Sequence, residues 1–320
     1  MKFKMIYSFL KADIDLIEKE LKQAIDSRSP LLNEASLHLV EAGGKRIRPV
    51  FVLLSAKFGR YDIHSIKNVA VALELIHSAS LVHDDVIDDA DLRRGRPTIK
   101  SQWDNRTAMY TGDYIFARSL EYMTKIQNED AHKILSNAIV ELTVGEIEQI
   151  KDKYRFDQDL KDYLRRIKRK TALLIAVSCQ LGAISAGAPP HIHKKLYRFG
   201  YNVGMSFQIT DDILDFTASE EELGKPAGSD LLQGNITLPV LFAMQDAGLK
   251  EKIIRVDETA EQEYLTSVIE DIKRCGAIEQ SHELSSRYLK KALKELEGLP
   301  KNGANKTLRD IANFIGRRKF

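Results

Sequence analysis

Cysteine is nearly absent from this chain of 320 residues, which holds only Cys179 and Cys275. Two thiols that far apart are too few for a disulfide framework or a zinc site, so they are most simply interpreted as reduced thiols of a cytoplasmic protein. An excess of either charge is also lacking, because 48 basic and 46 acidic side chains leave a net charge of +2. No overall cationic field therefore argues for a nucleic-acid partner.

A long apolar run that would mark a leader or a membrane span is lacking as well. The apolar N-terminal run is ended by Lys11 and Asp13, which is unlike a signal peptide. The uncharged stretch 171–188 is long enough to raise the question of a membrane span. It contains Gln180 and is closed by Pro189, so it is interpreted as a buried helix. The prediction is a soluble, cytoplasmic chain with no transmembrane segment.

Alternation with a period of two is scarce, whereas helical spacing dominates the chain. The clearest apolar stripe runs from Ile66 to Asp84 in steps of three and four, which predicts a helix of about six turns. Further helices are expected at 4–25, 31–42, 47–58, 107–127, 130–151, 159–187, 191–217, 236–247, 261–274, 279–297 and 305–317. Glycine and proline separate these segments, but no flexible linker does. The prediction is one all-α domain covering 1–320.

Two copies of an acidic DDxxD motif are the most informative feature that the chain does contain. Their carboxylates are Asp84, Asp85 and Asp88, and Asp211, Asp212 and Asp215. On a helix, like charges four residues apart share a face and repel each other, so they require a neutralising partner. Mg²⁺ commonly joins a few carboxylates to the phosphates of a substrate. A single copy is more often a solvated helix face, but two copies inside apolar runs predict a site for Mg²⁺ and a diphosphate.

Two basic clusters are placed near the first acidic motif. The run from Gly43 to Pro49 offers Lys45 and Arg48 at the expected start of a helix, where anions bind well. Arg93 and Arg94 follow the motif and could fold back over metal-bound phosphates. Taken alone, the first cluster would more usually be a solvated loop, and the second would be interpreted as a surface turn.

Four further polar residues complete the candidate set: Lys170, Thr171, Gln208 and Lys225. Gln208 lies three residues before the second motif, hence on the same helical face. A lysine suits a leaving diphosphate, and the oxygen of an amide or hydroxyl suits a developing cation. Each of these residues alone, however, usually has a structural role. His77 lies two turns before the first motif. It could bind a ligand there, or it could be a structural histidine whose hydrogen bonds are made within the protein.

The order and spacing of these motifs resemble the trans-polyprenyl diphosphate synthases over about residues 40 to 240. The resemblance rests on Gly-Gly-Lys-Arg-x-Arg-Pro, on a DDxxD trailed by Arg-Arg-Gly, on Lys-Thr, on Phe-Gln before the second DDxxD, and on Gly-Lys-Pro. It implies an antiparallel helix bundle around a deep central cavity, usually dimeric. It also implies that the two acidic motifs face each other and hold about three Mg²⁺ ions.

The resemblance further implies which residue serves which substrate. The allylic primer would be held by Arg93, Lys170, Thr171, Gln208 and Lys225, and isopentenyl diphosphate by Lys45, Arg48, His77 and Arg94. Asp230 would support the metal shell. Asn235 stands where many members carry a lysine, which leaves one contact with the primer diphosphate in doubt. The basic tail residues 317–319 are interpreted as solvated, with a reach toward isopentenyl diphosphate as the alternative.

The whole chain resembles more narrowly the large, catalytic subunits of two-component synthases of bacilli. This implies farnesyl diphosphate as primer, a heptaprenyl (C35) product for the menaquinone side chain, and a small non-catalytic component 1 subunit as partner. A homodimeric hexa- to decaprenyl synthase is an alternative. Two other functions are alternatives: a non-catalytic partner of another synthase and a class I terpene cyclase. The non-catalytic partner would not need both acidic motifs. The cyclase would not need the residues for isopentenyl diphosphate.

The residues before the first motif bear on product length. The growing tail is expected to run along this helix, where Ser80 and Ala79 lie four and five residues before Asp84. Both are small, and one turn rises about 5.4 Å, close to one isoprene unit. Ile76, one turn further, is not bulky enough to stop the tail. A product longer than farnesyl diphosphate is predicted.

Overall fold

The computed structural model describes residues 3–93, 95–219 and 226–316. The candidate residues Arg94 and Lys225 and the tail 317–319 lie outside them. Contacts group the chain into two compact units whose segments interleave along the sequence. The first unit comprises 1–135, 177–197 and 300–308, and the second comprises 136–176, 198–299 and 309–320. A single domain over 1–320 stays a prediction.

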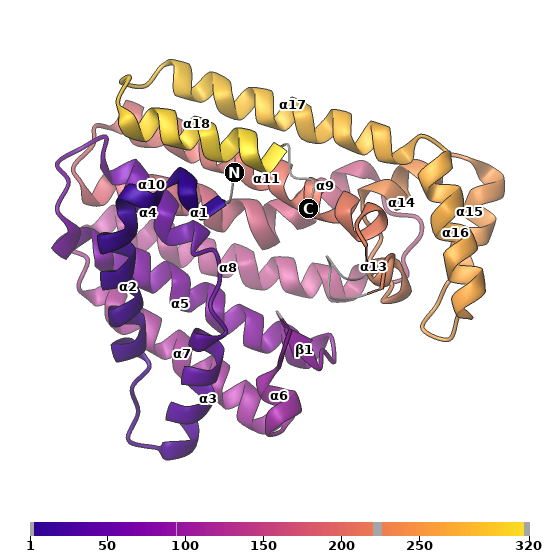
Figure 1. Ribbon diagram of the computed structural model, residues 1–320, viewed down its shortest axis with the longest axis horizontal. Helices are drawn as coiled ribbons and strands as arrows, with labels where there is room; N and C mark the ends of the chain where they lie inside the picture. The colour runs from indigo at the N-terminus through magenta and orange to yellow at the C-terminus, as the bar shows by residue number, and fades with distance from the viewer. Residues whose placement is uncertain (1–2, 94, 220–225, 317–320) are drawn as a thin grey trace. The chain divides into compact units, whose positions relative to one another are not determined.

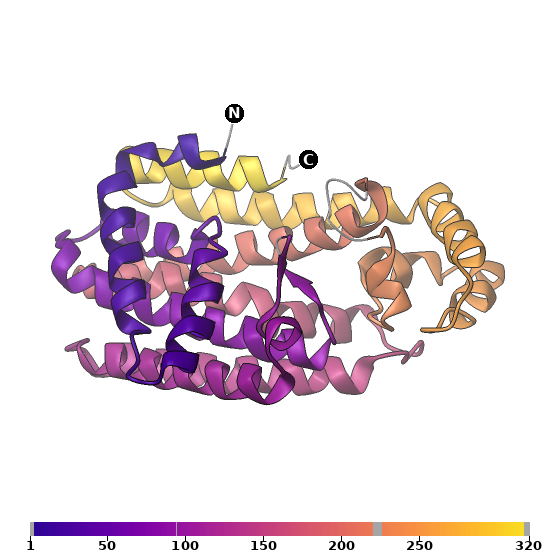
Figure 2. The ribbon, with the colours of Figure 1, turned by 60° about the horizontal axis from the view of Figure 1, so that its bottom comes forward.

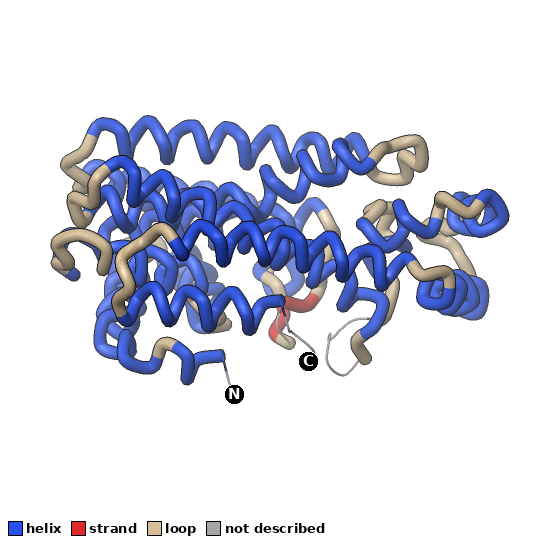
Figure 3. Tube along the Cα trace, turned by 90° about the horizontal axis from the view of Figure 1, so that it is seen from above, coloured by secondary structure: helices blue, strands red, loops and turns tan. Residues whose placement is uncertain are grey.

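Helices make up nearly all of the regular structure, which confirms the all-α prediction (Figure 3). Among the described residues, the exception is a hairpin of two short antiparallel strands, β1 (Leu92–Arg93) and β2 (Arg96–Pro97). The periodic pattern could not reveal strands of two residues.

Three expected helices are divided in the structure. The segment 4–25 forms α1 (Phe3–Ile6), the 3₁₀ turn η1 (Ser8–Leu10) and α2 (Lys11–Ala24). The segment 159–187 forms α9 (Leu160–Ile167), a π-helical turn η2 (Lys168–Ala172) and α10 (Leu173–Ser185). The segment 236–247 forms α14 (Leu238–Ala243) and the start of α15 (Ala247–Ile254). Apolar periodicity persists across such breaks, so it does not locate them.

Helix α5 (Ile63–Ile87) lies among the helices of the first unit (Figures 1 and 2). Its N-cap is Asp62, whose carboxylate accepts a hydrogen bond from the His64 N–H. It packs against α2, α4 (Ile47–Ala56) and α7 (Asn105–Thr124), while α3 (Pro30–Glu41) and α6 (Ile99–Gln102) pack on α7. A Cβ added to Gly112 would lie 2.4 Å from His83 Nε2, so glycine is what lets α7 approach α5 closely.

The core of the second unit gathers around the last turns of α11 (Pro190–Thr217). Buried apolar side chains at Ile209, Ile213 and Phe216 recur in steps of four and three and form one stripe. Around it pack α9, α13 (Ser229–Leu232), α14, α16 (Gln262–Arg274) and α17 (Ala277–Glu297). Boundaries between the units fall within four helices, namely α10, α11, α8 (Glu129–Asp152) and α18 (Gly303–Gly316).

Burial accounts for the apolar stretch that raised the membrane question, and for one further apolar helix. The residues of α10 are almost all buried, as the interpretation of 171–188 required. Among the described residues, only α5 is long and apolar enough to cross a bilayer, and 67% of its apolar window is buried inside the protein. A largely buried window of this kind is typical of a core helix.

Candidate active site

The first acidic motif ends α5, as the stripe predicted. Asp84 and Asp85 lie in its last turn, and Asp88 is the C-cap, with its N–H donating to the Asp84 carbonyl at 2.8 Å. Asp85 is only 3% exposed, while Asp84 and Asp88 are half-buried. The C-terminal end of a helix carries partial negative charge, so three carboxylates there need cations more than they would elsewhere.

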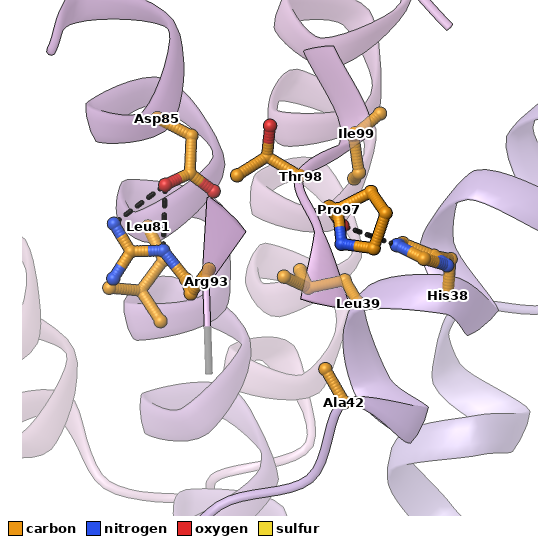
Figure 4. Close-up of a pocket in the computed structure, with 9 residues that line it drawn as sticks. All are labelled: His38, Leu39, Ala42, Leu81, Asp85, Arg93, Pro97, Thr98 and Ile99. Carbon is orange, nitrogen blue, oxygen red and sulfur yellow. Dashed lines mark hydrogen bonds and ion pairs between the residues drawn. The ribbon is translucent and has the colours of Figure 1, made fainter. Parts of the chain in front are cut away.

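Arg93 of β1 folds back onto this motif (Figure 4). Its Nε and Nη2 atoms each lie 2.7 Å from Asp85 Oδ1. Burial raises the pKa of Asp85, and the charge and hydrogen bond of Arg93 oppose that shift. The hairpin is held by His38 of α3, whose ring nitrogen lies 2.7 Å from the Pro97 carbonyl oxygen. A water-sized cavity of about 20 Å³ lies between these groups.

The basic loop (residues 43–48) lies at the start of α4. Gly43 has φ 70° and ends α3, as glycine commonly does after a helix. Lys45 is exposed and Arg48 is half-buried in the first turn of α4. The Tyr7 hydroxyl donates to the Lys45 carbonyl oxygen at 3.0 Å, so the N-terminal segment fixes the loop. A cavity of about 330 Å³ beside the loop is lined in part by Tyr7, Lys11 and Lys45.

The candidate residues on α5 fall on two sides of the helix. Ile76 and Ser80 precede Asp84 by eight and four residues, so all three share one face of α5. Ala79 shares a face with His83, which packs against α7. Ile76 and Ala79 are each 2% exposed, and Ser80 is half-buried with its hydroxyl on the His77 carbonyl at 2.9 Å. Control of product length by these residues, and binding by the half-buried His77, stay predictions.

The second acidic motif occupies the last two turns of α11 and is the more deeply buried. Asp212 and Asp215 are 3% and 2% exposed, and Asp211 is half-buried. Tyr163 of α9 donates its hydroxyl to Asp212 Oδ2 at 2.6 Å, and Gln208 donates its amide to Oδ1 at 2.9 Å. Burial raises the pKa of Asp212 to about 7, although these two hydrogen bonds act in the opposite direction. Desolvation of the charged carboxylate therefore outweighs its hydrogen bonds.

The segment after α11 returns to support Asp215. The Ser229 hydroxyl donates to Asp215 Oδ1 at 3.1 Å, and the Asp230 N–H donates to Oδ2 at 3.3 Å. Asp230 therefore lies beside the second motif. The N–H of Asn235 donates to the Asp230 carbonyl at 2.8 Å, so Asn235 closes this turn through its backbone.

Lys170 and Thr171 lie in the π-helical turn η2, a rare conformation that is frequent at functional sites. Glycines on both neighbouring helices make room for it. A Cβ on Gly145 of α8 would lie 2.7 Å from Arg169 Cβ, and one on Gly204 of α11 would lie 2.5 Å from Ala172 Cα.

The side chains of this turn reach two different partners. The Thr171 hydroxyl donates to Gln208 Oε1 at 2.6 Å, which extends the network around Asp212. The Lys170 ammonium lies 3.1 Å from Glu146 Oε2. In the second unit, hydrogen bonds thus join Thr171 and Gln208 to Asp212 of the second motif, whereas Lys170 is paired with Glu146 of α8.

Three residues of these networks were missed in the sequence: Arg46 of the basic loop, Glu146 and Tyr163. Each contacts a partner more than 20 residues away, as in Arg46–Glu18, Lys170–Glu146 and Tyr163–Asp212. The motifs themselves carry no signal for them. A burial pattern on α9 could have marked Tyr163 as an inward-facing residue, but not its partner.

The donor chemistry of both motifs suits a hard divalent cation, because all their ligand atoms are carboxylate oxygens. Within the described ranges, no three acidic, histidine or cysteine side chains form a ready-made metal cage. Mg²⁺ characteristically takes one or two carboxylates and completes its shell with substrate phosphates and water, so the carboxylate donors of either motif are of the kind that would hold it.

Comparisons with known proteins show the family of the chain. The family model described as Polyprenyl synthetase matches residues 29–272. The chain is 65% identical to heptaprenyl diphosphate synthase component 2 of Bacillus subtilis (strain 168), covering 100% of this chain and 92% of that protein.

Two solved structures are similar along almost their whole length. The heptaprenyl diphosphate synthase of Staphylococcus aureus has a TM-score of 0.93 and 43% identity, covering 97% of this chain and 98% of that one. A polyprenyl synthase of Caulobacter crescentus CB15, complexed with calcium and isoprenyl diphosphate, has a TM-score of 0.93 and 31% identity. That match covers 99% of this chain and 98% of that one.

Proposed function

Because the chain belongs to the polyprenyl synthetase family and is a prenyltransferase, we propose that it extends an allylic diphosphate with isopentenyl diphosphate units. The proposed primer is farnesyl diphosphate and the proposed product is heptaprenyl diphosphate (C35), for the menaquinone side chain. The proposed setting is the cytoplasm.

The burial of Asp212 is the observation that carries this proposal. Burial raises the pKa of this carboxylate to about 7, which means that its charged form destabilises the folded protein. A bound cation would offset that cost, so the site favours one. Asp85, buried in the first motif, has its pKa raised by burial as well. We propose that the two motifs face each other and share one diphosphate through about three Mg²⁺ ions.

The proposed mechanism assigns the protein the tasks of holding two diphosphates and excluding water. Mg²⁺, when bound, neutralises charge on the primer diphosphate and makes it a better leaving group. Arg93, Lys170 and Lys225 would stabilise the departing anion, and Thr171 and Gln208 would present oxygen atoms to the allylic cation.

The second substrate would be held by Lys45, Arg48, His77 and Arg94. Its double bond attacks the allylic cation, which forms the new carbon–carbon bond. The released diphosphate accepts the proton that is then lost, so no protein nucleophile is needed.

An exposed apolar stripe on α8 supports a protein partner. Val140, Val144, Ile147 and Ile150 are between 39% and 58% exposed and recur in steps of three and four. A contiguous apolar helix face usually marks an interaction surface. The Bacillus subtilis relative is named as component 2 of its enzyme. We therefore propose a small non-catalytic subunit as partner, with a homodimer as the alternative.

Incorporation of radiolabelled isopentenyl diphosphate tests the reaction. The purified chain, alone and with a candidate small subunit, is incubated with farnesyl diphosphate and Mg²⁺, and dephosphorylated products are separated by chromatography. A C35 product that requires both proteins supports the two-component enzyme, whereas a product from the chain alone supports the homodimer. Loss of activity in Asp84→Ala within the mixture shows that this chain is the catalytic one. Cyclised products without incorporation of label would indicate a terpene cyclase instead.

A further inference from the structure

Arg46 combines two features that are each unusual for an arginine. Its backbone is left-handed, with φ 46° and ψ 42°, at the residue that precedes α4. A residue with a Cβ is strained in this region and stays there only when its surroundings hold it. Its side chain is also only 8% exposed, and arginines are rarely buried without partners. Strong contacts must therefore fix both the backbone and the side chain.

The side chain of Arg46 supplies those contacts by joining three helices. Nε and Nη2 donate to the two carboxylate oxygens of Glu18 on α2, at 2.5 and 3.1 Å. Nη1 donates to Glu74 of α5 at 3.1 Å, and Nη2 also donates to the Val40 carbonyl near the end of α3 at 3.1 Å. Burial alone would lower the pKa of Arg46, but the hydrogen bonds and charges of both glutamates outweigh it and raise that pKa. The guanidinium therefore stays charged.

The residues proposed to hold isopentenyl diphosphate lie directly beside these contacts. Lys45 precedes Arg46, and Arg48 follows it by two residues in the first turn of α4. His77 follows Glu74 by three residues on α5, so the two side chains are neighbours on the surface of the helix. The pair Arg46–Glu74 thus links the part of the basic loop that carries the two cations to the turn of α5 that carries the histidine.

We propose that Arg46 is a positioning residue that fixes the basic loop against α5 and thereby sets the affinity for isopentenyl diphosphate. The inference rests on the proposed function, because it assigns Arg46 to the site of that substrate. In this role Arg46 acts through Lys45, Arg48 and His77, because its guanidinium is already engaged by Glu18, Glu74 and the Val40 carbonyl. Misplacement of positioning groups by about 1 Å can cost an enzyme two orders of magnitude in rate.

A residue that only stabilises the fold would behave differently in steady-state kinetics. It would reduce the amount of folded enzyme, and with it the apparent kcat, while both KM values stayed unchanged. A positioning residue for one substrate raises the KM for that substrate and leaves the KM for the allylic primer unchanged.

Two variants and one matched control separate these cases. Arg46→Lys keeps the charge but loses the two-pronged contact with Glu18. Glu74→Gln keeps the shape but removes the charge that faces Arg46. Lys67→Met is the control, because Lys67 forms an ion pair with Glu20 that also joins α5 to α2 but does not reach the basic loop. Each protein is assayed with whatever subunit gives wild-type activity, and its Tm is measured alongside.

The expected result is a KM for isopentenyl diphosphate raised roughly tenfold in Arg46→Lys and several-fold in Glu74→Gln. The KM for the primer should change by less than about twofold in both, and Lys67→Met should lower Tm without moving either KM. Equal changes in both KM values, or none, in folded Arg46→Lys and Glu74→Gln would overturn the inference. A wild-type enzyme that incorporates no isopentenyl diphosphate would overturn the proposed function, and the inference with it.

Discussion

Replacing Asp212 by asparagine should stabilise the metal-free protein while abolishing its activity. The carboxylate is 3% exposed, and burial raises its pKa from 3.8 to about 7. Asparagine has the shape of the protonated acid and carries no charge at any pH. The substitution therefore removes a buried anion that a metal ion would otherwise compensate.

The sign of the effect follows from proton linkage. Because the pKa is higher in the folded than in the unfolded chain, the protonated acid contributes stability in full below pH 4. This contribution is lost as the pH rises to about 7. A shift of about three units corresponds to ~4 kcal/mol in all, at 1.36 kcal/mol per unit. About 2 kcal/mol of this is lost between pH 5.5 and pH 8, a range in which the protein can be handled.

Thermal unfolding in EDTA measures the difference. For a chain of 320 residues, 1 kcal/mol corresponds to about 1.5 °C in Tm. The Tm of the wild type should therefore fall by about 3 °C relative to Asp212→Asn between pH 5.5 and pH 8. Adding Mg²⁺ with inorganic diphosphate should raise the Tm of the wild type more than that of the variant.

Two results would refute this reasoning. Parallel pH profiles of Tm for wild type and Asp212→Asn would mean that the buried carboxylate does not titrate with a raised pKa. Retention of wild-type activity in Asp212→Asn would mean that the second motif does not act as proposed. Asp246→Asn is a matched control for the charge change, because Asp246 is exposed and asparagine can replace aspartate as the N-cap of α15.

Three further predictions concern product length, packing and assembly. Ser80→Phe or Ala79→Phe should shorten the product to about three or four isoprene units, because a ring there would block the tail; chromatography of dephosphorylated products checks this, and an unchanged product ladder would contradict it. Gly204→Ala should cost about 1–3 kcal/mol of unfolding free energy, since its Cβ would lie 2.5 Å from Ala172 Cα, and urea unfolding measures the loss. Val144→Asp should weaken association with the partner without lowering Tm, as gel filtration and thermal unfolding would show; an unchanged elution profile would remove the α8 stripe from the interface.

Apolar periodicity and motif spacing, which the sequence alone contains, were enough to predict several features of this protein. The stripe from Ile66 to Asp84 predicted a helix that ends at the first acidic motif, and α5 ends at Ile87. Helix periodicity and motif spacing are properties of neighbouring residues, so a single sequence contains them. The same local information was enough to predict the all-α class and the family, and to single out the carboxylates of both motifs as candidates.

Tertiary structure alone decided how those carboxylates and cations are supported. Arg46 meets Glu18 and Glu74, each 28 residues away, and Tyr163 meets Asp212 across 49 residues. The strained backbone of Arg46 and the π-helical turn at Lys170 leave the apolar period almost unchanged, so no local pattern signals them. Burial and long-range pairing depend on which helices pack together, and this is also why the raised pKa of Asp212 could not be foreseen from the sequence.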